Sequence, residues 1–428
     1  MTTIPQGPIA ERFDSEASAG EPCVYAIATL DTKGAELSWL TDLLRRIGVA
    51  VRTVDVGTLD SPTVVSDVSR EEVLAGRVIS ETDRGEAVTE MGEALREFLV
   101  AQNSRGQVSG VVGLGGSGGT ALITAAMRAL PIGLPKLMVS TVASGNTAPY
   151  VDGCDILMMH SVVDIAGLNA VSENILANAA HAMAGMVTHP RARTGSRPAL
   201  GMTMFGVTTP CVTRVREMLE QNGYDPLVFH ATGAGGRAME RLVESGLIGG
   251  VLDLTTTEVA DELVGGVFPG GPERFDRLLA ARIPVVVSLG AVDMVNFGAP
   301  ETIPPRFSDR RFHRHNAQVT LMRTTPDENR VIGRWIAEKL NRSVAPLRLL
   351  IPEGGVSALD APGQPFHDPA ANAALFEGLS GALRATSQRR LIRLPHHIND
   401  PEFADAVVRH FSEIAAAAPT ARDAASER

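Results

Sequence analysis

Residues Val108–Thr120 read VSGVVGLGGSGGT, and this stretch decides the fold. Its apolar start, Val108–Val112, predicts a buried strand, and a helix-prone segment, Ala121–Leu130, follows the glycines. Glycine lets the main chain approach a ligand closely, and the first amides of the next helix point at whatever lies above them. The usual occupant of such a place is a phosphate. The sequence therefore predicts a phosphorylated small molecule as the ligand.

Strands and helices alternate on both sides of this stretch. Val24–Leu30 predicts an apolar strand, Ala35–Ile47 predicts a helix, and Val49–Val56 predicts the next strand. Such alternation predicts a parallel sheet with helices on both faces. The expected fold class is α/β, with two Rossmann-like subdomains, each a mostly parallel sheet flanked by helices.

The helical and strand periodicity stops at Thr188–Pro198, THPRARTGSRP, and then restarts. The second half echoes the first, because it carries another Gly-rich turn, Gly233–Gly236, before a predicted helix, Arg237–Gly246. An internal duplication and a simple repetition of α/β units both account for this echo. The predicted parts are a disordered tail 1–21, an N-terminal domain 22–190, a linker 191–198, a C-terminal domain 199–416 and a tail 417–428.

Composition excludes several classes of protein. The formal net charge is −10 over 428 residues, 4% of them aromatic, and no basic stripe occurs, so we expect no nucleic-acid partner. The 3 cysteines are widely spaced and form no CxxC motif, which indicates a reducing compartment and a cytoplasmic protein. The chain start has no apolar signal-peptide core, and no apolar run reaches the roughly 18 residues of a membrane span.

The Gly-rich stretch admits other interpretations. Gly113, Gly115 and Gly118 match G-x-G-x-x-G, but no acidic residue follows in Pro135–Thr141 to hold a ribose, and the P-loop pattern is absent. The glycines could also serve only tight helix–sheet packing. We favour phosphate contact, because four glycines fall within five residues beside two hydroxyls. The predicted contacts are Gly115, Gly116, Ser117, Gly118, Gly119 and Thr120.

Two other strand ends are predicted at the same edge of the sheet. Asp31, Thr32 and Lys33 follow the first strand, where the Lys33 ammonium could meet a phosphate and Asp31 could alternatively cap a helix. A hydroxyl-rich loop follows the strand after the Gly-rich turn, and it could complete a phosphate cradle. Its predicted contacts are Thr141, Ser144, Gly145 and Asn146.

The C-terminal half supplies further candidates. A second group of residues is expected to line a cleft between the domains: Gly235, Gly236, Glu353, Gly354 and Gly355.

Two groups of side chains are candidate metal ligands. Mg²⁺ could be held by the acids Asp152, Asp155 and Asp164 with Asn169, and a metal could be held by His313 and His315. Solvated side chains are the simpler interpretation. Asp360 and His367 lie in a proline-rich loop, a typical place for functional residues, but no G-x-S-x-G elbow supports a serine nucleophile.

Seven motifs together resemble one known family. They are ATLDTKGAE, VDVG, GLGGSGGT, MVSTVASGN, DILMMHSVVDIAGLN, HNAQVTLMRTT and IPEGGVSALDAPGQPFHDP. These motifs resemble the N-terminal domain of the tomato mosaic virus resistance protein. The family of this domain is largely bacterial, and the resemblance covers nearly the whole chain. The resemblance implies two α/β subdomains joined near residue 200, a homodimer and ATP binding. Plant members carry a further barrel-like region, so a separate barrel-domain protein is an expected partner.

Three functions remain open from the sequence. The first is a cytosolic ATP-binding protein that holds the nucleotide, with Mg²⁺ bridging its phosphates, in an interdomain cleft over Gly115–Thr120. The second is an enzyme of small-molecule catabolism, a hydrolase or lyase that acts on a phosphorylated or carboxylated metabolite. The third is a binding module that regulates a partner through its nucleotide state.

Overall fold

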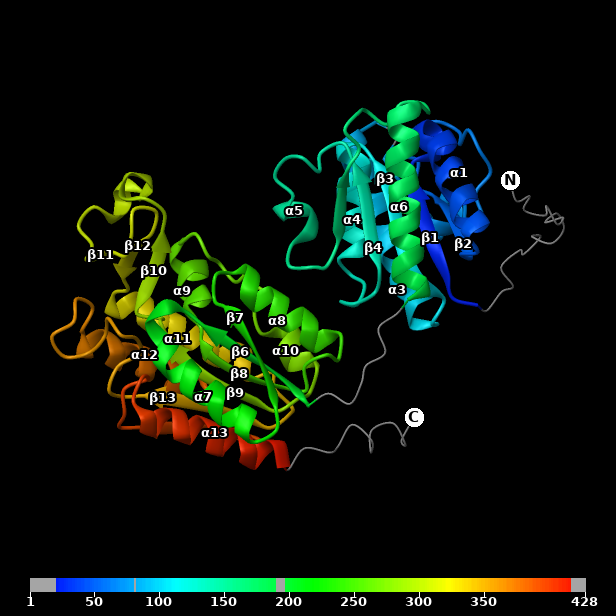
Figure 1. The fold of residues 1–428 in the computed structure, drawn as a ribbon. Helices are drawn as coiled ribbons and strands as arrows, with labels where there is room; N and C mark the ends of the chain where they lie inside the picture. The colour runs from blue at the N-terminus through cyan, green and yellow to red at the C-terminus, as the bar shows by residue number, and fades with distance from the viewer. Residues whose placement is uncertain (1–20, 81, 190–196, 417–428) are drawn as a thin grey trace, which may run out of the picture. The chain divides into compact units, whose positions relative to one another are not determined.

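The computed structural model describes residues 21–80, 82–189 and 197–416 (Figure 1). The chain divides into two compact units, Met1–Ala192 and Arg193–Arg428. The predicted tails, apart from residue 21, and most of the predicted linker lie outside the described residues. No helix in the described part of the chain is both long and apolar enough to span a bilayer.

The first unit is a five-stranded parallel sheet with the strand order β2-β1-β3-β4-β5. Helices α1 and α6 pack on one face of the sheet, and α3 and α4 pack on the other (Figure 1). The strands are β1 (Cys23–Ala28), β2 (Val51–Asp55), β3 (Val108–Gly115), β4 (Lys136–Ser140) and β5 (Leu157–His160). The helices are α1 (Leu30–Ile47), α2 (Arg70–Leu74), α3 (Arg84–Ser104), α4 (Ser117–Met127), α5 (Ala148–Val151) and α6 (Ala170–Thr188).

The continuous apolar run of β1, CVYAIA, is buried at every residue. A strand with helices on both faces needs such a run, whereas a strand with one wet face alternates. The strand order places β1 between β2 and β3, so the connections that leave β1 and β3 diverge to opposite faces. In doubly wound sheets the crevice at this switch point, at the carboxyl ends of the strands, is where ligands bind.

The second unit contains a six-stranded parallel sheet with the order β14-β13-β9-β8-β6-β7. Its strands are β6 (Ala199–Met204), β7 (Asp225–His230), β8 (Gly250–Thr255), β9 (Val285–Gly290), β13 (Leu347–Pro352) and β14 (Arg389–Leu394). A small antiparallel sheet joins β10 (Met294–Phe297), β12 (Thr320–Arg323) and β11 (Phe312–Arg314). The first five strands of the six-stranded sheet, counted along the chain, repeat the strand order of the first unit.

Helices cover both faces of the larger sheet. One face carries α7 (Thr209–Gln221) and α13 (Pro401–Ala416), which share an apolar cluster. The other face carries α8 (Ala234–Glu244), α9 (Thr257–Val264), α10 (Asp276–Ala280), α11 (Pro326–Leu340) and α12 (Pro369–Ala382). Short 3₁₀ turns lie at η1 (Gly206–Thr208), η2 (Pro300–Thr302) and η3 (Pro305–Phe307). The predicted fold class, two α/β units with mostly parallel sheets, is confirmed.

Several predicted helix starts were placed too late along the chain. The helix after the glycines begins at Ser117 rather than Ala121, and the helix predicted from Ala35 begins at Leu30. Glycine and short polar residues have low helix propensity, so the apolar pattern begins only after the first turn. Because β3 ends at Gly115 and α4 begins at Ser117, the glycines belong to the end of the strand and the start of the helix, and they do not form a separate turn.

Candidate functional site

A cavity of about 220 Å³ lies at the carboxyl edge of the first sheet. The connections after β1, β2 and β3 line it together with the start of α3, as expected for the switch point of this strand order. The described lining residues are Thr29, Asp31, Thr32, Lys33, Thr58, Leu59, Arg84, Val88, Gly116, Ser117, Gly118, Gly119 and Leu122. The structure thus brings two of the predicted groups together, the residues after β1 and the Gly-rich segment.

The first turn of α4 presents free amides at this cavity. Gly116 is the N-cap residue, no side chain caps the helix, and the amide of Thr120 donates to the Gly116 carbonyl at 2.8 Å. The amides of the three residues between them, Ser117 to Gly119, precede that bond and have no acceptor from the helix itself. Because these residues line the cavity, the positive end of the α4 dipole lies at its wall.

The packing interpretation of the glycines can be tested position by position. A Cβ atom at Gly113 would lie 2.6 Å from the Met138 sulfur, and one at Gly115 would lie 3.1 Å from the Gly119 Cα. These two glycines therefore serve the close approach of α4 to the sheet. A Cβ at Gly118 would meet no atom within 4 Å, and at Gly116 or Gly119 the nearest atom would be 3.9 Å away. Packing does not account for these three glycines, which all line the cavity.

Two cations line the same cavity. Lys33 lies in α1 at a kink in the backbone (φ −125°, ψ 19°), and Arg84 is the first residue of α3. Within the described residues neither side chain has a hydrogen bond or an ion pair. Two unpaired cations beside free helix amides make an electropositive site suited to an anion.

Asp31 is a carboxylate in the same cavity. Its Oδ2 accepts a hydrogen bond from the Leu59 amide at 3.2 Å, whereas Oδ1 is buried with no partner among the described residues. The N-cap of α1 is Thr29, so the alternative that Asp31 caps this helix is wrong. The hydroxyls of Thr29 and Thr32 lie 3.0 Å apart at the same place.

The hydroxyl-rich loop after β4 does not line the cavity. Asn146 Oδ1 accepts from the Ala148 amide at 3.2 Å at the start of α5, while Ser144 and Gly145 are exposed. Thr141 is nearer, since its Oγ1 would lie 3.9 Å from a Cβ at Gly116. Thr120 is fully buried, and its hydroxyl pairs with that of Ser140 at 2.6 Å. Thr120 therefore fastens α4 to β4, and its side chain does not face the cavity.

The second Gly-rich turn already holds an anion of the protein itself. Glu258 Oε1 accepts from the amides of Gly233 and Gly236 at 2.6 and 3.1 Å, at the start of α8. A Cβ at Gly235 would collide with the His230 carbonyl oxygen, and a Cβ at Gly236 would collide with the Glu258 carboxylate. The expectation that Gly235 and Gly236 contact a ligand is therefore corrected. Gly236 lacks a side chain because an internal carboxylate occupies the helix start, and Gly235 lacks one because the His230 main chain lies against it.

Contacts within the second unit also explain the group after β13. Glu353 pairs with Arg393, with Oε1 and Nε 2.6 Å apart. A Cβ at Gly354 would lie 2.6 Å from the His397 amide nitrogen, and Gly355 has a φ of +133° that L side chains rarely adopt. These three residues hold loops together, and their expected contact with a ligand stays a prediction.

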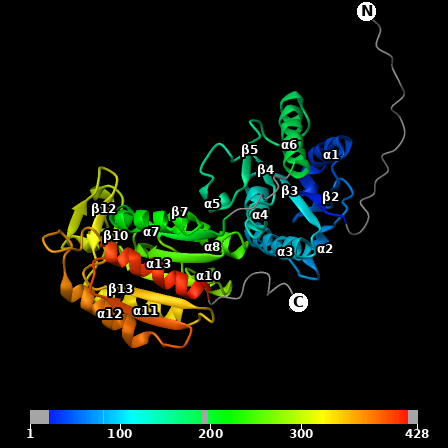
Figure 2. The same ribbon diagram turned by 60° about the horizontal axis from the view of Figure 1, so that its bottom comes forward.

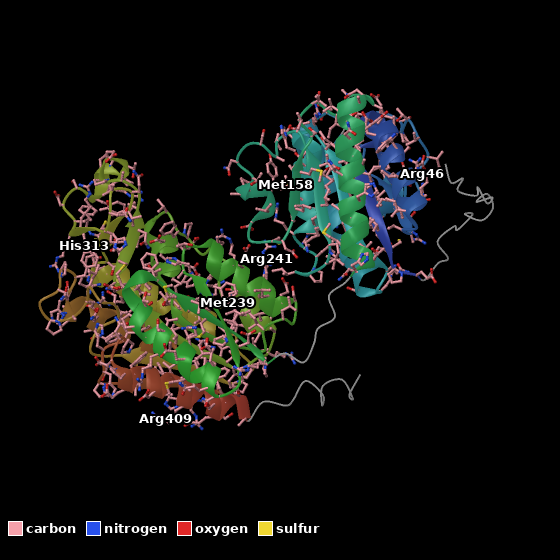
Figure 3. The ribbon with its side chains drawn as sticks, in the orientation of Figure 1. Arg46, Met158, Met239, Arg241, His313 and Arg409 are labelled. Carbon is pink, nitrogen blue, oxygen red and sulfur yellow. The ribbon has the colours of Figure 1, made fainter. Side chains whose placement is uncertain are left out.

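Three of the predicted metal ligands have other roles. Asp155 pairs with Lys136 at 2.7 Å, and Asn169 caps α6. His313 lies on β11 (Figure 3), where its ring packs edge-on against Phe366. The described residues contain no group of three or more His, Cys, Asp or Glu side chains that could hold a metal ion.

Asp360 belongs to a buried polar network that fastens the proline-rich loop. Its Oδ2 accepts from the Val356 amide at 3.0 Å and from Asn372 Nδ2 at 2.7 Å. Beside it, Ser357 Oγ donates to Asp293 Oδ2 at 2.8 Å. Burial raises the pKa of Asp293 to about 7. His367 Nδ1 is buried without a partner among the described residues.

Sequence reasoning missed Arg84, the first residue of α3. A signal was available, since Asp83 followed three residues later by Glu86 is a typical helix start. The Asp83 carboxylate does accept hydrogen bonds from the amides of Gly85 and Glu86 at 2.8 and 3.0 Å. This cap positions Arg84 at the cavity.

The fold and the cavity define a doubly wound α/β protein whose first unit has a cavity lined by two cations and by helix amides. Family models assign the chain to a particular protein family. Residues 22–192 match the N-terminal domain, and residues 197–415 the C-terminal domain, of the "Uncharacterised protein family (UPF0261)". The chain belongs to this family.

Sequence relatives agree with the assignment. A UPF0261 protein of Rhizobium meliloti (strain 1021) is 56% identical over 92% of this chain and 99% of its own length. The ToMV resistance protein Tm-1(GCR237) of Solanum lycopersicum is 47% identical over 93% of this chain, which spans 56% of that protein. Among solved structures, the UDP-GlcNAc 2-epimerase from Methanocaldococcus jannaschii matches over 91% of this chain and 92% of its own, with 10% identity and a TM-score of 0.22. The resemblance to the tomato resistance protein family is confirmed.

Proposed function

We propose that the cavity between β1 and β3 binds a phosphorylated small molecule, with ATP as the first candidate. The observation that carries this proposal is the contrast among the glycines: Gly116, Gly118 and Gly119 line the cavity although packing leaves room for side chains there. A ligand that approaches the main chain closely explains their absence. ATP is the ligand implied by the family resemblance, and its phosphates suit the amides of Ser117–Gly119.

Charge supports the same proposal. Lys33 and Arg84 lie at the cavity without protein partners among the described residues, and a polyphosphate would supply their counter-charge. Mg²⁺ would arrive with the nucleotide, because it usually keeps waters and phosphate oxygens among its ligands. Asp31 is the carboxylate among the described lining residues that could meet it.

Calorimetric titration of the full chain with MgATP tests the proposal. Lys33→Ala and Gly118→Val should each raise the Kd for ATP about tenfold or more, the first by removing a charge and the second by filling the cavity. Arg105→Ala, at the far end of α3, and Gly185→Val, an open glycine of α6, are the matched controls and should stay within about twofold. Equal affinity in all variants, or no heat with wild type, rejects the proposal.

Asp31 favours a second candidate, an enzyme that acts on a phosphorylated metabolite. A buried carboxylate oxygen without a partner is costly, and active sites are a common place for such groups. Product analysis after incubation with ATP and phosphorylated acids would compare wild type with Asp31→Asn. Turnover that the variant loses while its ATP affinity persists supports the enzyme, and no turnover on any substrate contradicts it.

We also propose the homodimer that the resemblance implies, through the open edge of the first sheet. β5 is an edge strand, and large apolar side chains are exposed along it and the segment that follows: Leu157, Val162, Leu168 and Val171. Exposed edges of this kind favour pairing with another chain. Light scattering should give twice the chain mass for wild type, and Leu157→Lys with Val162→Lys should shift it towards one chain mass. A single-chain mass for wild type contradicts the dimer.

A further inference from the structure

A groove between α3 and α4 continues the phosphate cavity. It encloses about 220 Å³, and Val88 and Leu122 line both spaces. We infer that this groove receives the base of a nucleotide whose phosphates lie on the start of α4. The inference rests on the proposed function and deepens it, because it gives the base its own site and so favours nucleotides over phosphorylated metabolites without a base.

The geometry of the two helices directs the groove away from the cavity. Both helices lead from the carboxyl edge to the opposite edge of the sheet, and they pack against each other on the same face (Figure 2). Val88, Gly92 and Arg96 recur at intervals of four residues along α3, so they lie on one side of it. From Gly118 to Ala125 the rise along α4 is roughly 10 Å. The groove thus runs about two helical turns beyond the site proposed for the phosphates.

Small side chains keep the groove open and flat. Gly92, Ala121 and Ala125 line it, and a Cβ at Gly92 would lie 3.7 Å from the Leu122 Cα, so the helices approach closely at its floor. Leu122 is only 2% exposed and forms an apolar base. A groove with small residues and an apolar base leaves room for an aromatic ring system, and pockets for small ligands combine such surfaces with a few polar groups.

Polar groups lie at the edge of this slot. Glu93 and Arg96 line it and have neither a hydrogen bond nor an ion pair within the described part of the chain. A carboxylate and a guanidinium can accept from and donate to the ring nitrogens and exocyclic groups of a base. An acyl chain would leave both groups without partners, so the pair favours a base as the occupant.

The test separates the groove from the phosphate site by using two probes, MgATP and inorganic tripolyphosphate. Ala121→Phe fills the groove from α4, and Thr89→Phe fills it from α3; both residues are exposed, so folding should tolerate the change. Each variant should lose about tenfold or more in ATP affinity while its tripolyphosphate affinity stays within about twofold of wild type. Ala101→Phe, an exposed alanine of α3 outside the groove, should leave both affinities unchanged.

The possible failures are distinguishable. If tripolyphosphate and ATP both fail to bind wild type, the proposed function falls and the inference falls with it. If wild type binds both probes and the two groove variants keep full ATP affinity, only the groove inference is overturned. Equal wild-type affinity for ATP and tripolyphosphate also overturns it, because the base would then contribute nothing.

Discussion

The Gly-rich segments Gly113–Gly119 and Gly233–Gly236 both lead into a helix, yet their surroundings differ. The first follows β3 at the switch point of its sheet, and a cavity faces its amides. The second follows β7, an edge strand, and the carboxylate of Glu258 accepts from the amides of Gly233 and Gly236. A helix start stabilises a negative group in either case. The second unit supplies that group from its own chain, whereas no side chain caps the start of α4 in the first unit, where we propose that a ligand binds.

The largest expected effect comes from removing the internal anion. Glu258 also pairs with Arg274, with Oε2 and Nε 2.9 Å apart, and both side chains are at most 1% exposed. Glu258→Ala should lower the free energy of unfolding by about 3–5 kcal/mol, because buried donors lose their acceptor. Urea unfolding measures this change. Glu244→Ala, which removes an exposed pair with Arg277, is the control and should cost less than about 1 kcal/mol. Similar unfolding midpoints for both variants would contradict the role given to Glu258.

A smaller loss is expected from a single methyl group in the second turn. Gly235→Ala places a Cβ against the His230 carbonyl oxygen, which is backbone and cannot move aside cheaply. The expected cost is about 1–3 kcal/mol, typical of overpacking. Thermal unfolding followed by circular dichroism measures it. An unchanged melting temperature would show that position 235 has room for a side chain, which we assign only to glycines of the first segment.

Buried acids of the second unit should also make its stability depend on pH. Burial raises the pKa of Asp293 to about 7, so its carboxyl binds a proton in the folded protein where the unfolded chain, with a pKa near 3.8, has lost it. Stability should therefore fall as the pH rises from about 4 to about 7, by at most about 1.4 kcal/mol per pH unit, and then level off. Asp293→Asn should flatten this part of the curve in urea unfolding at several pH values. Parallel curves for wild type and variant would contradict the assignment.

The smallest effect is expected in the first segment. Gly118→Ala adds a methyl group where no atom lies within 4 Å, so stability should change by no more than about 0.5 kcal/mol. Differential scanning calorimetry without ligand measures it. Gly113→Ala is the matched comparison, because its Cβ would meet Met138 and Ile123 at 2.6 and 2.7 Å, and it should be clearly destabilised. Equal losses in both variants would mean that packing explains the whole segment.

The sequence predicted strands better than it predicted ligand contacts. β3 and β1 were found because a strand buried on both faces is a continuous apolar run. The error at Gly236 has a long-range cause, since its partner Glu258 follows 22 residues later in another helix. No local pattern distinguishes a helix start that holds an internal carboxylate from one that is open.

The remaining errors also have physical causes. Ser144 and Asn146 do follow β4 at the predicted edge, but Asn146 turns back to the start of α5, and sequence alone does not give the direction of a loop. Lys33 was found because it follows β1 directly. Arg84 was not found: the spacing of Asp83 and Glu86 indicates the start of its helix, but the sequence does not show which residues lie across the cavity from it.

The kink at Lys33 has a consequence for a residue outside the cavity. Gly34 follows it, and a Cβ there would collide with Thr63 and lie 2.9 Å from a Val64 methyl carbon. The loop after β2 thus rests directly on the main chain beside Lys33. Any side chain at position 34 would push the two apart and displace Lys33 from its place at the cavity. Under the proposed function, ligand binding would then weaken through a residue that does not itself line the cavity.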